Sequence, residues 1–314
     1  MVRGRSNQEM IRQVIKGVRE WSDFIKFPHT VFALPFGLGA MVVAARENHG
    51  WPGIRTFLLI LAAMVTARSC AMSFNRIVDQ RYDAMNPRTA NWQLPAGRIK
   101  LSVAITFCAA NALAFVFICY WINSLCFLLS PVALFVICFY SFTKRFTHFS
   151  HFFLGLSLGI APVGAWLAVR GTEVTPIELV QMGLLALAVV FWVVGFDVIY
   201  ALQDYEFDRT HGLKSLVVLL GPERVLDVSL ISHIVMILLL AAFGILCGFR
   251  LGYFGGWVII SCCLFMEHWI ARHRSKNWIQ TAFFKLNALI STVFFVSTLA
   301  EVVFRGGFRL WDPN

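Results

Sequence analysis

The chain has 314 residues, of which 58% are hydrophobic and only 14% are charged, whereas soluble domains average about 25% charged residues. The mean hydropathy is +0.71, and this composition excludes an ordinary soluble domain. The formal net charge is +10. No basic stripe or basic globular segment gathers that charge, which argues against a nucleic-acid-binding protein.

The N-terminal segment, residues 1–27, is basic and lacks the pattern of a cleaved signal peptide. Apolar residues recur at helical spacing over 8–26, and basic residues occupy the other face. This pattern predicts an amphipathic helix that lies on the inner surface of a membrane. A solvated basic arm is the alternative.

Nine apolar runs follow, and each approaches the roughly 20 residues that a spanning helix needs. They cover approximately 28–45, 52–74, 101–119, 121–141, 150–169, 177–203, 226–247, 251–270 and 281–303. No polar stretch is long enough for a separate soluble domain. The sequence therefore predicts an all-α polytopic membrane protein, with one bundle of about nine transmembrane helices over residues 28–314.

The basic residues between these runs predict the orientation. With the N-terminus inside, the inner segments carry 19 of the 27 Lys and Arg residues, and the outer segments carry 5. Because cytoplasmic loops are enriched in Lys and Arg, we expect a cytoplasmic N-terminus. Topology and anionic lipid then explain the net charge.

Small residues inside the apolar runs predict packing and no redox or metal chemistry. The eight cysteines lie in or beside these runs, and none has Cys-x-x-Cys spacing, so we expect no disulfide. Gly155 and Gly159 form a small-xxx-small pair, which is typical of close helix packing.

Two segments repeat one acidic pattern at the ends of apolar runs. The first, NRIVDQRYD, begins at Asn75, and the second, YALQDYEFD, begins at Tyr200. Each places two aspartates at four-residue steps, and the two pairs are 125 residues apart; they are Asp79, Asp83, Asp204 and Asp208. Side chains four residues apart share one face of a helix.

The repetition predicts a metal site. Two carboxylates at that spacing repel each other. A single pair can arise by chance, but two copies at the same spacing need a reason. Mg²⁺ is usually bound by one or two carboxylates together with substrate phosphates. The motifs therefore predict two Mg²⁺ sites that face one diphosphate on the cytoplasmic side.

Further polar residues accompany the motifs. Arg68 and Asp197 each lie seven residues before a motif residue, within an apolar run. A charge there costs about 2.5–3.5 kcal/mol on insertion scales, and such residues usually face a polar cavity. The loop NPRTANWQLPAGRIK (86–100) and the segment YSFTKR (140–145) add basic residues. Ordinary topological anchors are the alternative explanation for both.

These residues support a family resemblance. The matching stretches are KFPHTVFALPFGL (26–38), RSCAMSFNRIVDQRYDAMNPRTANWQLPAGRI (68–99), YSFTKRFT (140–147) and DVIYALQDYEFDRTHGLKSL (197–216). The chain resembles the UbiA superfamily of intramembrane aromatic prenyltransferases, and most of all its 4-hydroxybenzoate polyprenyltransferase branch. Trp92 departs from the pattern, since a basic or polar residue is expected there.

The resemblance implies a Mg²⁺-dependent transferase that moves a polyprenyl group from polyprenyl diphosphate to an aromatic acceptor in quinone biosynthesis. The implied acceptor is 4-hydroxybenzoate. A futalosine-derived or naphthoate acceptor in menaquinone biosynthesis is the alternative. The implied setting is a multi-pass protein of a bacterial inner membrane, with the bilayer and the two substrates as its partners and with no nucleic acid or obligate protein partner.

The resemblance also implies residue roles. The four motif aspartates would hold the metals directly or through water, and Asn75 would orient the first motif. Four basic residues would neutralise the departing diphosphate: Arg68, Lys144, Arg145 and Lys214. Three more would contact the acceptor or the diphosphate: Tyr140, Tyr200 and Asp197.

A secondary transporter is the alternative from another class, because transporters also show internal repeats and intramembrane charges. Transporter sites lie near the bilayer midplane, however, and these carboxylates lie at the ends of two spans. The discriminating property is turnover that depends on Mg²⁺.

Overall fold

The computed structural model describes residues 17, 19–26, 30–273 and 276–304. Most of the predicted N-terminal amphipathic helix lies outside these ranges. Residues 19–24 are helical, and Trp21 and Phe24 pack with Leu94 and Ile99 at one end of the molecule. The described part of this segment therefore contacts the protein itself.

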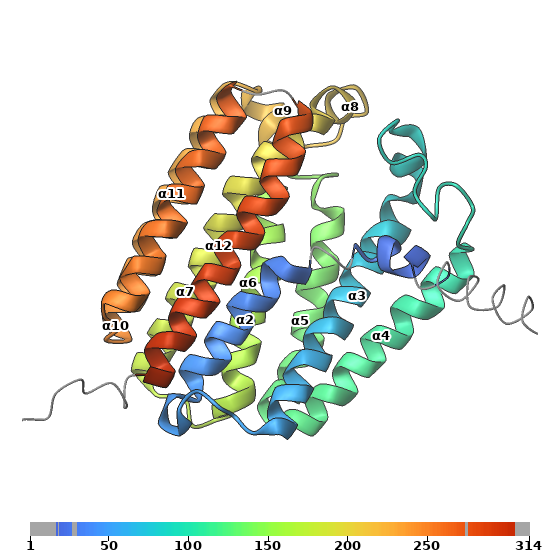
Figure 1. The fold of residues 1–314 in the computed structure, drawn as a ribbon. Coiled ribbons are helices and arrows are strands. Elements are labelled where there is room, and N and C mark those ends of the chain that lie inside the picture. The colour runs from blue at the N-terminus through green and yellow to red at the C-terminus, as the bar shows by residue number, and fades with distance from the viewer. Residues whose placement is uncertain (1–16, 18, 27–29, 274–275, 305–314) are drawn as a thin grey trace, which may run out of the picture.

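The long helices run alongside one another in a single bundle (Figure 1). They are α2 (Thr30–Ala44), α3 (Ile54–Met85), α4 (Leu101–Ile122), α5 (Ser124–Thr143), α6 (Ser150–Arg170), α7 (Pro176–Ala201), α10 (Arg224–Leu246), α11 (Leu251–His273) and α12 (Lys276–Phe304). Among the described residues, eight helices are long and apolar enough to span a membrane. The predicted class is confirmed.

The predicted span at 28–45 corresponds to α2, which is not among these eight helices because it is shorter than the others. It has 15 residues and is therefore about 22 Å long, less than the roughly 30 Å of a hydrocarbon core. It contacts α6 and α12. The 3-10 helix η2 (Arg46–Asn48) follows it closely.

The second aspartate motif departs from the predicted regular helix. α7 ends at Ala201, and the 3-10 helix η3 (Leu202–Asp204) and the short helix α8 (Tyr205–Thr210) follow. Its residues therefore do not share one continuous α-helical face. The first motif does lie on regular helix, because α3 continues through Met85.

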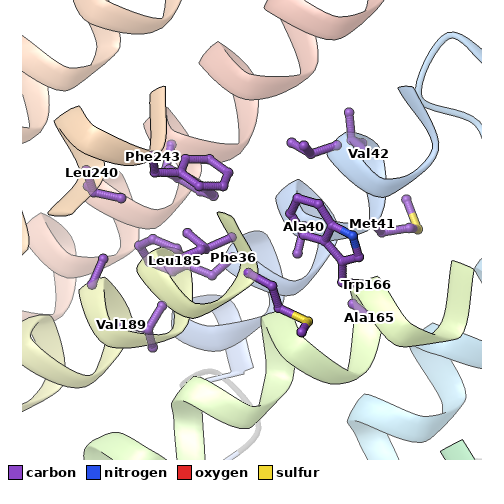
Figure 2. Packing of buried hydrophobic residues seen from close by; sticks show 14 of the residues in the cluster. Phe36, Ala40, Met41, Val42, Ala165, Trp166, Leu185, Val189, Leu240 and Phe243 are labelled. Atoms are coloured by element: carbon purple, nitrogen blue, oxygen red, sulfur yellow. The ribbon is translucent and has the colours of Figure 1, made fainter. Parts of the chain in front are cut away.

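The core surrounds α7, which packs on α6 and α10. Figure 2 shows Leu185 and Val189 of α7 near Phe36 of α2 and Phe243 of α10. All four side chains are fully buried. In the most apolar part of α7, 67% of the residues are buried, against 17% for α4. α7 is therefore the central helix, and α4 lies at the periphery.

The glycine pair of α6 allows a close approach to α7, as the sequence predicts. A Cβ atom on Gly155 would lie 2.8 Å from the carbonyl oxygen of Val190, and one on Gly159 would lie 3.0 Å from that of Ala186. The close contact fixes the start of α6 against the second half of α7.

The two motifs meet at one end of the bundle. The loop between α3 and α4, the short helix α8 and the short helix α9 (Leu216–Leu220) all lie at that end (Figure 1). Segments more than one hundred residues apart thus surround one space.

Candidate active site

A polar cavity of about 220 Å³ lies at this end of the bundle. It is bounded by the end of α3, the following loop, the α5–α6 connection and the α7–α8 junction. Ten of the predicted site residues line it: Asn75, Asp79, Asp83, Tyr140, Lys144, Arg145, Asp197, Tyr200, Asp204 and Asp208. The structure thus brings both motifs to one cavity.

Asp79 is held by two donors. Asn75, one turn earlier on α3, donates from Nδ2 to Asp79 Oδ2 at 2.9 Å. Arg145, just after α5, donates from a guanidinium nitrogen to Asp79 Oδ1 at 2.9 Å and to the carbonyl oxygen of Val78 at 2.9 Å. The predicted orienting role of Asn75 has this contact as its structural basis.

Asp83 is less completely paired. The Arg76 guanidinium lies 3.7 Å from Asp83 Oδ2, too far for a hydrogen bond. No hydrogen-bond donor within the described ranges reaches this buried oxygen. Arg76 itself is 6% exposed and stacks on Trp92, with its guanidinium carbon 3.6 Å from the ring centroid. Asp83 Oδ2 therefore has an ion-pair contact with Arg76 but no hydrogen-bond donor among the described residues.

The second motif is paired with residues from other elements. Arg88 of the α3–α4 loop donates to Asp204 from Nε at 2.9 Å and from a terminal nitrogen at 2.6 Å. Asn86 adds a third bond at 3.1 Å. Lys144 donates to Asp208 Oδ2 at 3.0 Å. The two-pronged Arg88 contact is the strongest kind of pairing available to a carboxylate.

The charges in the cavity nearly cancel. Its lining includes five aspartates and four Arg or Lys side chains. Burial alone would lower the pKa of Lys144, but the charges of Asp208 and Asp204 outweigh that effect, and the pKa is raised. Burial likewise acts against Arg88, and the contact with Asp204 raises the pKa overall. Both groups therefore stay cationic.

Arg68 and Lys214 do not reach this cavity. Arg68 lies seven residues before Asn75, which is about 10 Å along the helix. It lines a different, apolar cavity, and its guanidinium lies 3.5 Å from the carbonyl oxygen of Lys26. Lys214 instead donates from Nζ to the carbonyl oxygen of Phe146 at 3.3 Å. Neither position supports the predicted contact with a diphosphate.

Several lining residues are absent from the predicted set. Arg76 has a sequence signal, since it lies three and seven residues before the α3 aspartates and hence on their face. Asn86 and Arg88 belong to the loop that the sequence singled out as basic. His151, whose Nδ1 lies 2.7 Å from Asp197 Oδ2, has no such signal, because nothing in its own segment indicates that α6 begins beside α7.

The apolar cavity has a volume of about 360 Å³ and extends between α2, α3, α4, α5 and α6. Its walls are mostly aliphatic and aromatic, and they include Met64, Phe115 and Ala133. Tyr140 and Leu154 line both cavities. A polar space and an apolar space therefore adjoin at these two residues.

The donor set fits Mg²⁺ only in part. Within the described ranges, no three Asp, Glu, His or Cys side chains converge closely enough to hold a metal ion by themselves. Carboxylate and amide oxygens are nevertheless the ligand type that Mg²⁺ prefers, and Mg²⁺ commonly combines one or two carboxylates with phosphate oxygens. Asp83 Oδ2, which lacks a hydrogen-bond donor within the described ranges, suits such a shared site.

The model of the UbiA prenyltransferase family matches residues 33–289. The chain belongs to the UbiA prenyltransferase family. It is thus a transferase and an integral, multi-pass membrane protein. It is 31% identical to the 4-hydroxybenzoate octaprenyltransferase of Francisella tularensis subsp. novicida (strain U112) over 268 residues. The aligned region covers 85% of this chain and 90% of that protein. The corresponding Paraburkholderia phytofirmans enzyme is 28% identical, with 79% and 86% covered.

Solved structures agree with the family fold. An apo UbiA homolog from Aeropyrum pernix K1 superposes with a TM-score of 0.77 at 30% identity, over 86% of this chain and 96% of that one. A homolog from Archaeoglobus fulgidus, solved with GPP and Mg²⁺, has a TM-score of 0.67 at 21% identity, over 89% and 99%. At that identity the second likeness shows the fold alone.

Proposed function

We propose that this UbiA-family prenyltransferase moves a polyprenyl group from polyprenyl diphosphate to an aromatic acceptor, 4-hydroxybenzoate, with Mg²⁺ as cofactor. The observation that carries the proposal is a polar cavity with two aspartate motifs and four cations that adjoins an apolar cavity. The names of the bacterial relatives support the acceptor. The archaeal homolog bound to GPP and Mg²⁺ supports the donor and the metal.

The polar cavity would bind the diphosphate by an exchange of partners. Arg88, Lys144 and Arg145 each hold an aspartate in the structure, and each can turn its donors to phosphate oxygens. The aspartates then become available to metal, which Asp79, Asp83, Asp204 and Asp208 would hold. Bound Mg²⁺ would neutralise charge on the phosphate oxygens as a Lewis acid. A diphosphate with its metals carries little net charge, which suits the nearly neutral lining.

The apolar cavity would hold the prenyl chain and exclude water from it. Tyr140 lies at the junction of the two cavities, so the reacting end of the chain would lie beside it. Tyr200 and Asp197 line the polar side and are proposed to contact the acceptor ring. Exclusion of water protects an allylic cation from hydrolysis.

The remaining topology is part of the proposal. Residues 28–314 would form the prenyltransferase domain, with residues 1–27 at the membrane surface. The excess of Lys and Arg at the end that carries the site supports a cytoplasmic N-terminus and a cytoplasmic opening of the polar cavity.

The proposal is tested with membranes that contain this protein, labelled 4-hydroxybenzoate and a polyprenyl diphosphate, with and without Mg²⁺. We expect a lipid-soluble labelled product that requires Mg²⁺. Asp79→Asn and Asp204→Asn should each reduce its formation by at least about 10²-fold, since each removes a carboxylate that would hold Mg²⁺ against the diphosphate.

Arg98→Gln serves as the matched control, because Arg98 is exposed and outside the cavity. If Mg²⁺-dependent release of diphosphate occurs without labelled product, the acceptor is a different aromatic compound, such as a naphthoate or a futalosine derivative. If folded protein gives neither product nor diphosphate with any of these acceptors, the prenyl-transfer proposal is wrong.

A further inference from the structure

His151 is a buried residue that diphosphate binding does not explain. It is the second residue of α6, is 1% exposed and lines the polar cavity. Its Nδ1 lies 2.7 Å from Asp197 Oδ2, and its Nε2 has no hydrogen-bond partner in the part of the chain that the structure describes. A buried polar atom without a partner destabilises a fold. The stability of the fold therefore gives no reason for this ring.

The pair lies where the donor and the acceptor would meet. Asp197 lies on α7, seven residues before Asp204. Seven residues of continuous helix would span about 10 Å, so Asp197 lies deeper in the bundle than the second motif. His151 is three residues before Leu154 on α6, so the two share a face, and Leu154 lines both cavities. Both side chains line the polar cavity, but Asp197 is 23% exposed and His151 only 1%, so the carboxylate is the more accessible of the two.

The proposed reaction releases one proton from the acceptor ring in each turnover. The allylic C–O bond breaks, and its electron pair leaves with the diphosphate. A ring carbon then forms the new C–C bond. The C–H bond at that carbon breaks, its electron pair restores aromaticity, and the proton needs an acceptor. The motif aspartates are engaged by cations or, in the proposed complex, by metal. Asp197 differs from them, because its partner in the structure is the imidazole of His151.

We infer that Asp197 accepts this proton and that His151 positions Asp197; the inference rests on the proposed function. His151 donates from Nδ1 to Asp197 Oδ2 across the 2.7 Å hydrogen bond, which leaves Oδ1 to face the acceptor. The proton from the ring carbon adds to Oδ1, while the Nδ1–H bond of His151 stays intact. The proton later returns to solvent through the polar cavity.

The test uses Asp197→Asn in the full-length protein with two acceptors, one of which carries deuterium at the ring position that is prenylated. Asparagine keeps an oxygen for the Nδ1–H of His151 but cannot take the proton. We expect kcat to fall by about 10²-fold, the lower end of general-base contributions, and a primary isotope effect on kcat to appear, because breakage of the ring C–H bond becomes rate-limiting. Binding of the prenyl diphosphate and the Mg²⁺ requirement should stay unchanged. His151→Leu, which removes the donor to Asp197, should show the same isotope effect, whereas His151→Gln keeps an N–H donor and should retain most of the wild-type kcat.

Asp227→Asn is the matched control. Asp227 lies outside the cavity lining, is 66% exposed and pairs with Arg272 at 2.8 Å, and its replacement should give neither effect. The inference is overturned if Asp197→Asn retains wild-type kcat, or if its kcat falls with no isotope effect, which would mean a positioning role alone. A wild-type protein that prenylates no aromatic acceptor would overturn the proposed function instead, so the two failures are distinguishable.

Discussion

Arg88 shows how one residue controls the resting state of the site. It comes from the α3–α4 loop and binds Asp204 through two nitrogens, at 2.9 and 2.6 Å. A buried carboxylate such as Asp204, which is 8% exposed, needs a partner because an unpaired charge is costly there. Arg88 thus stabilises the ligand-free protein, and it would compete with the metal that we propose Asp204 holds.

Replacement of Arg88 by methionine should therefore separate metal binding from diphosphate binding. Without diphosphate, Mg²⁺ should bind Arg88→Met about fivefold more tightly or better, since the competing charge-assisted bonds are gone. A non-reactive thiodiphosphate analogue of the donor should bind more weakly, because one phosphate partner is lost. Calorimetric titration of each ligand measures both affinities.

Arg98→Met is the control for that experiment, because Arg98 donates to the carbonyl oxygen of Asn91 at 2.8 Å and does not line the cavity. If Mg²⁺ binds Arg88→Met more weakly than it binds the wild-type protein, Arg88 does not compete with metal.

Individual site residues could be predicted where one regular helix carries them. Four-residue spacing placed Asp79 and Asp83 on one face correctly, because α3 stays helical through Met85. It did not reveal that Arg145 and Arg88 pair with aspartates, since those contacts join separate elements. Arg68 shared the predicted face, but seven residues place it about 10 Å from Asn75 along the helix, and it lines the apolar cavity instead.

At the scale of elements, the contact between α6 and α7 sets the position of the polar cavity wall. α6 carries His151 and Leu154 near its start, and α7 carries Asp197 near its end. Gly155 lets the two backbones approach, since a Cβ there would lie 2.8 Å from the Val190 carbonyl oxygen and 3.1 Å from its Cα. Backbone atoms cannot move aside as a flexible side chain can.

Gly155→Ala should therefore destabilise the protein by about 1–3 kcal/mol, the usual cost of overpacking. Thermal unfolding in detergent would show a lower midpoint. Gly183→Ala on α7 is the matched control, because a Cβ there meets nothing within 4 Å, and alanine favours helix over glycine by up to about 1 kcal/mol. Equal midpoints for the two variants would contradict the close-packing explanation.

The elements themselves were largely predictable, because a bilayer demands long apolar segments. The runs at 101–119 and 251–270, for example, correspond to α4 and α11. The break at η3 was not predictable. The stretch from Tyr200 to Asp208 has helical spacing but no proline or glycine to mark an interruption, so the change from α7 to α8 depends on tertiary contacts.

For the molecule as a whole, the two adjoining cavities imply a limit on the donor. Ala133 of α5 lines the apolar cavity seven residues before Tyr140, about 10 Å along the helix. That length corresponds to roughly two isoprene units of an extended chain. A longer donor must pass Ala133 to fit.

Ala133→Phe should therefore discriminate between donors by length. Transfer from geranyl diphosphate should stay within about threefold of the wild-type rate, while transfer from longer polyprenyl diphosphates should fall by at least about tenfold, because overpacking of an apolar cavity costs 1–3 kcal/mol. Competition assays with mixed donors measure the ratio. Leu128→Phe, at a position that is 71% exposed, is the control, and an equal loss with both donors would show that the chain does not run past Ala133.

The burial of α7 also bears on how the protein is made. α7 is enclosed by protein, yet its sequence is as apolar as that of helices that face lipid. In the finished molecule, polar side chains on α7 could form hydrogen bonds with neighbouring helices. During synthesis, however, α7 leaves the translocon and meets the bilayer before α10 and α12 have been made. Each charge near its centre would oppose insertion by about 2.5–3.5 kcal/mol. The order of synthesis therefore confines the reactive carboxylates to the last turns of this helix and beyond, and it draws the chemistry toward the membrane surface.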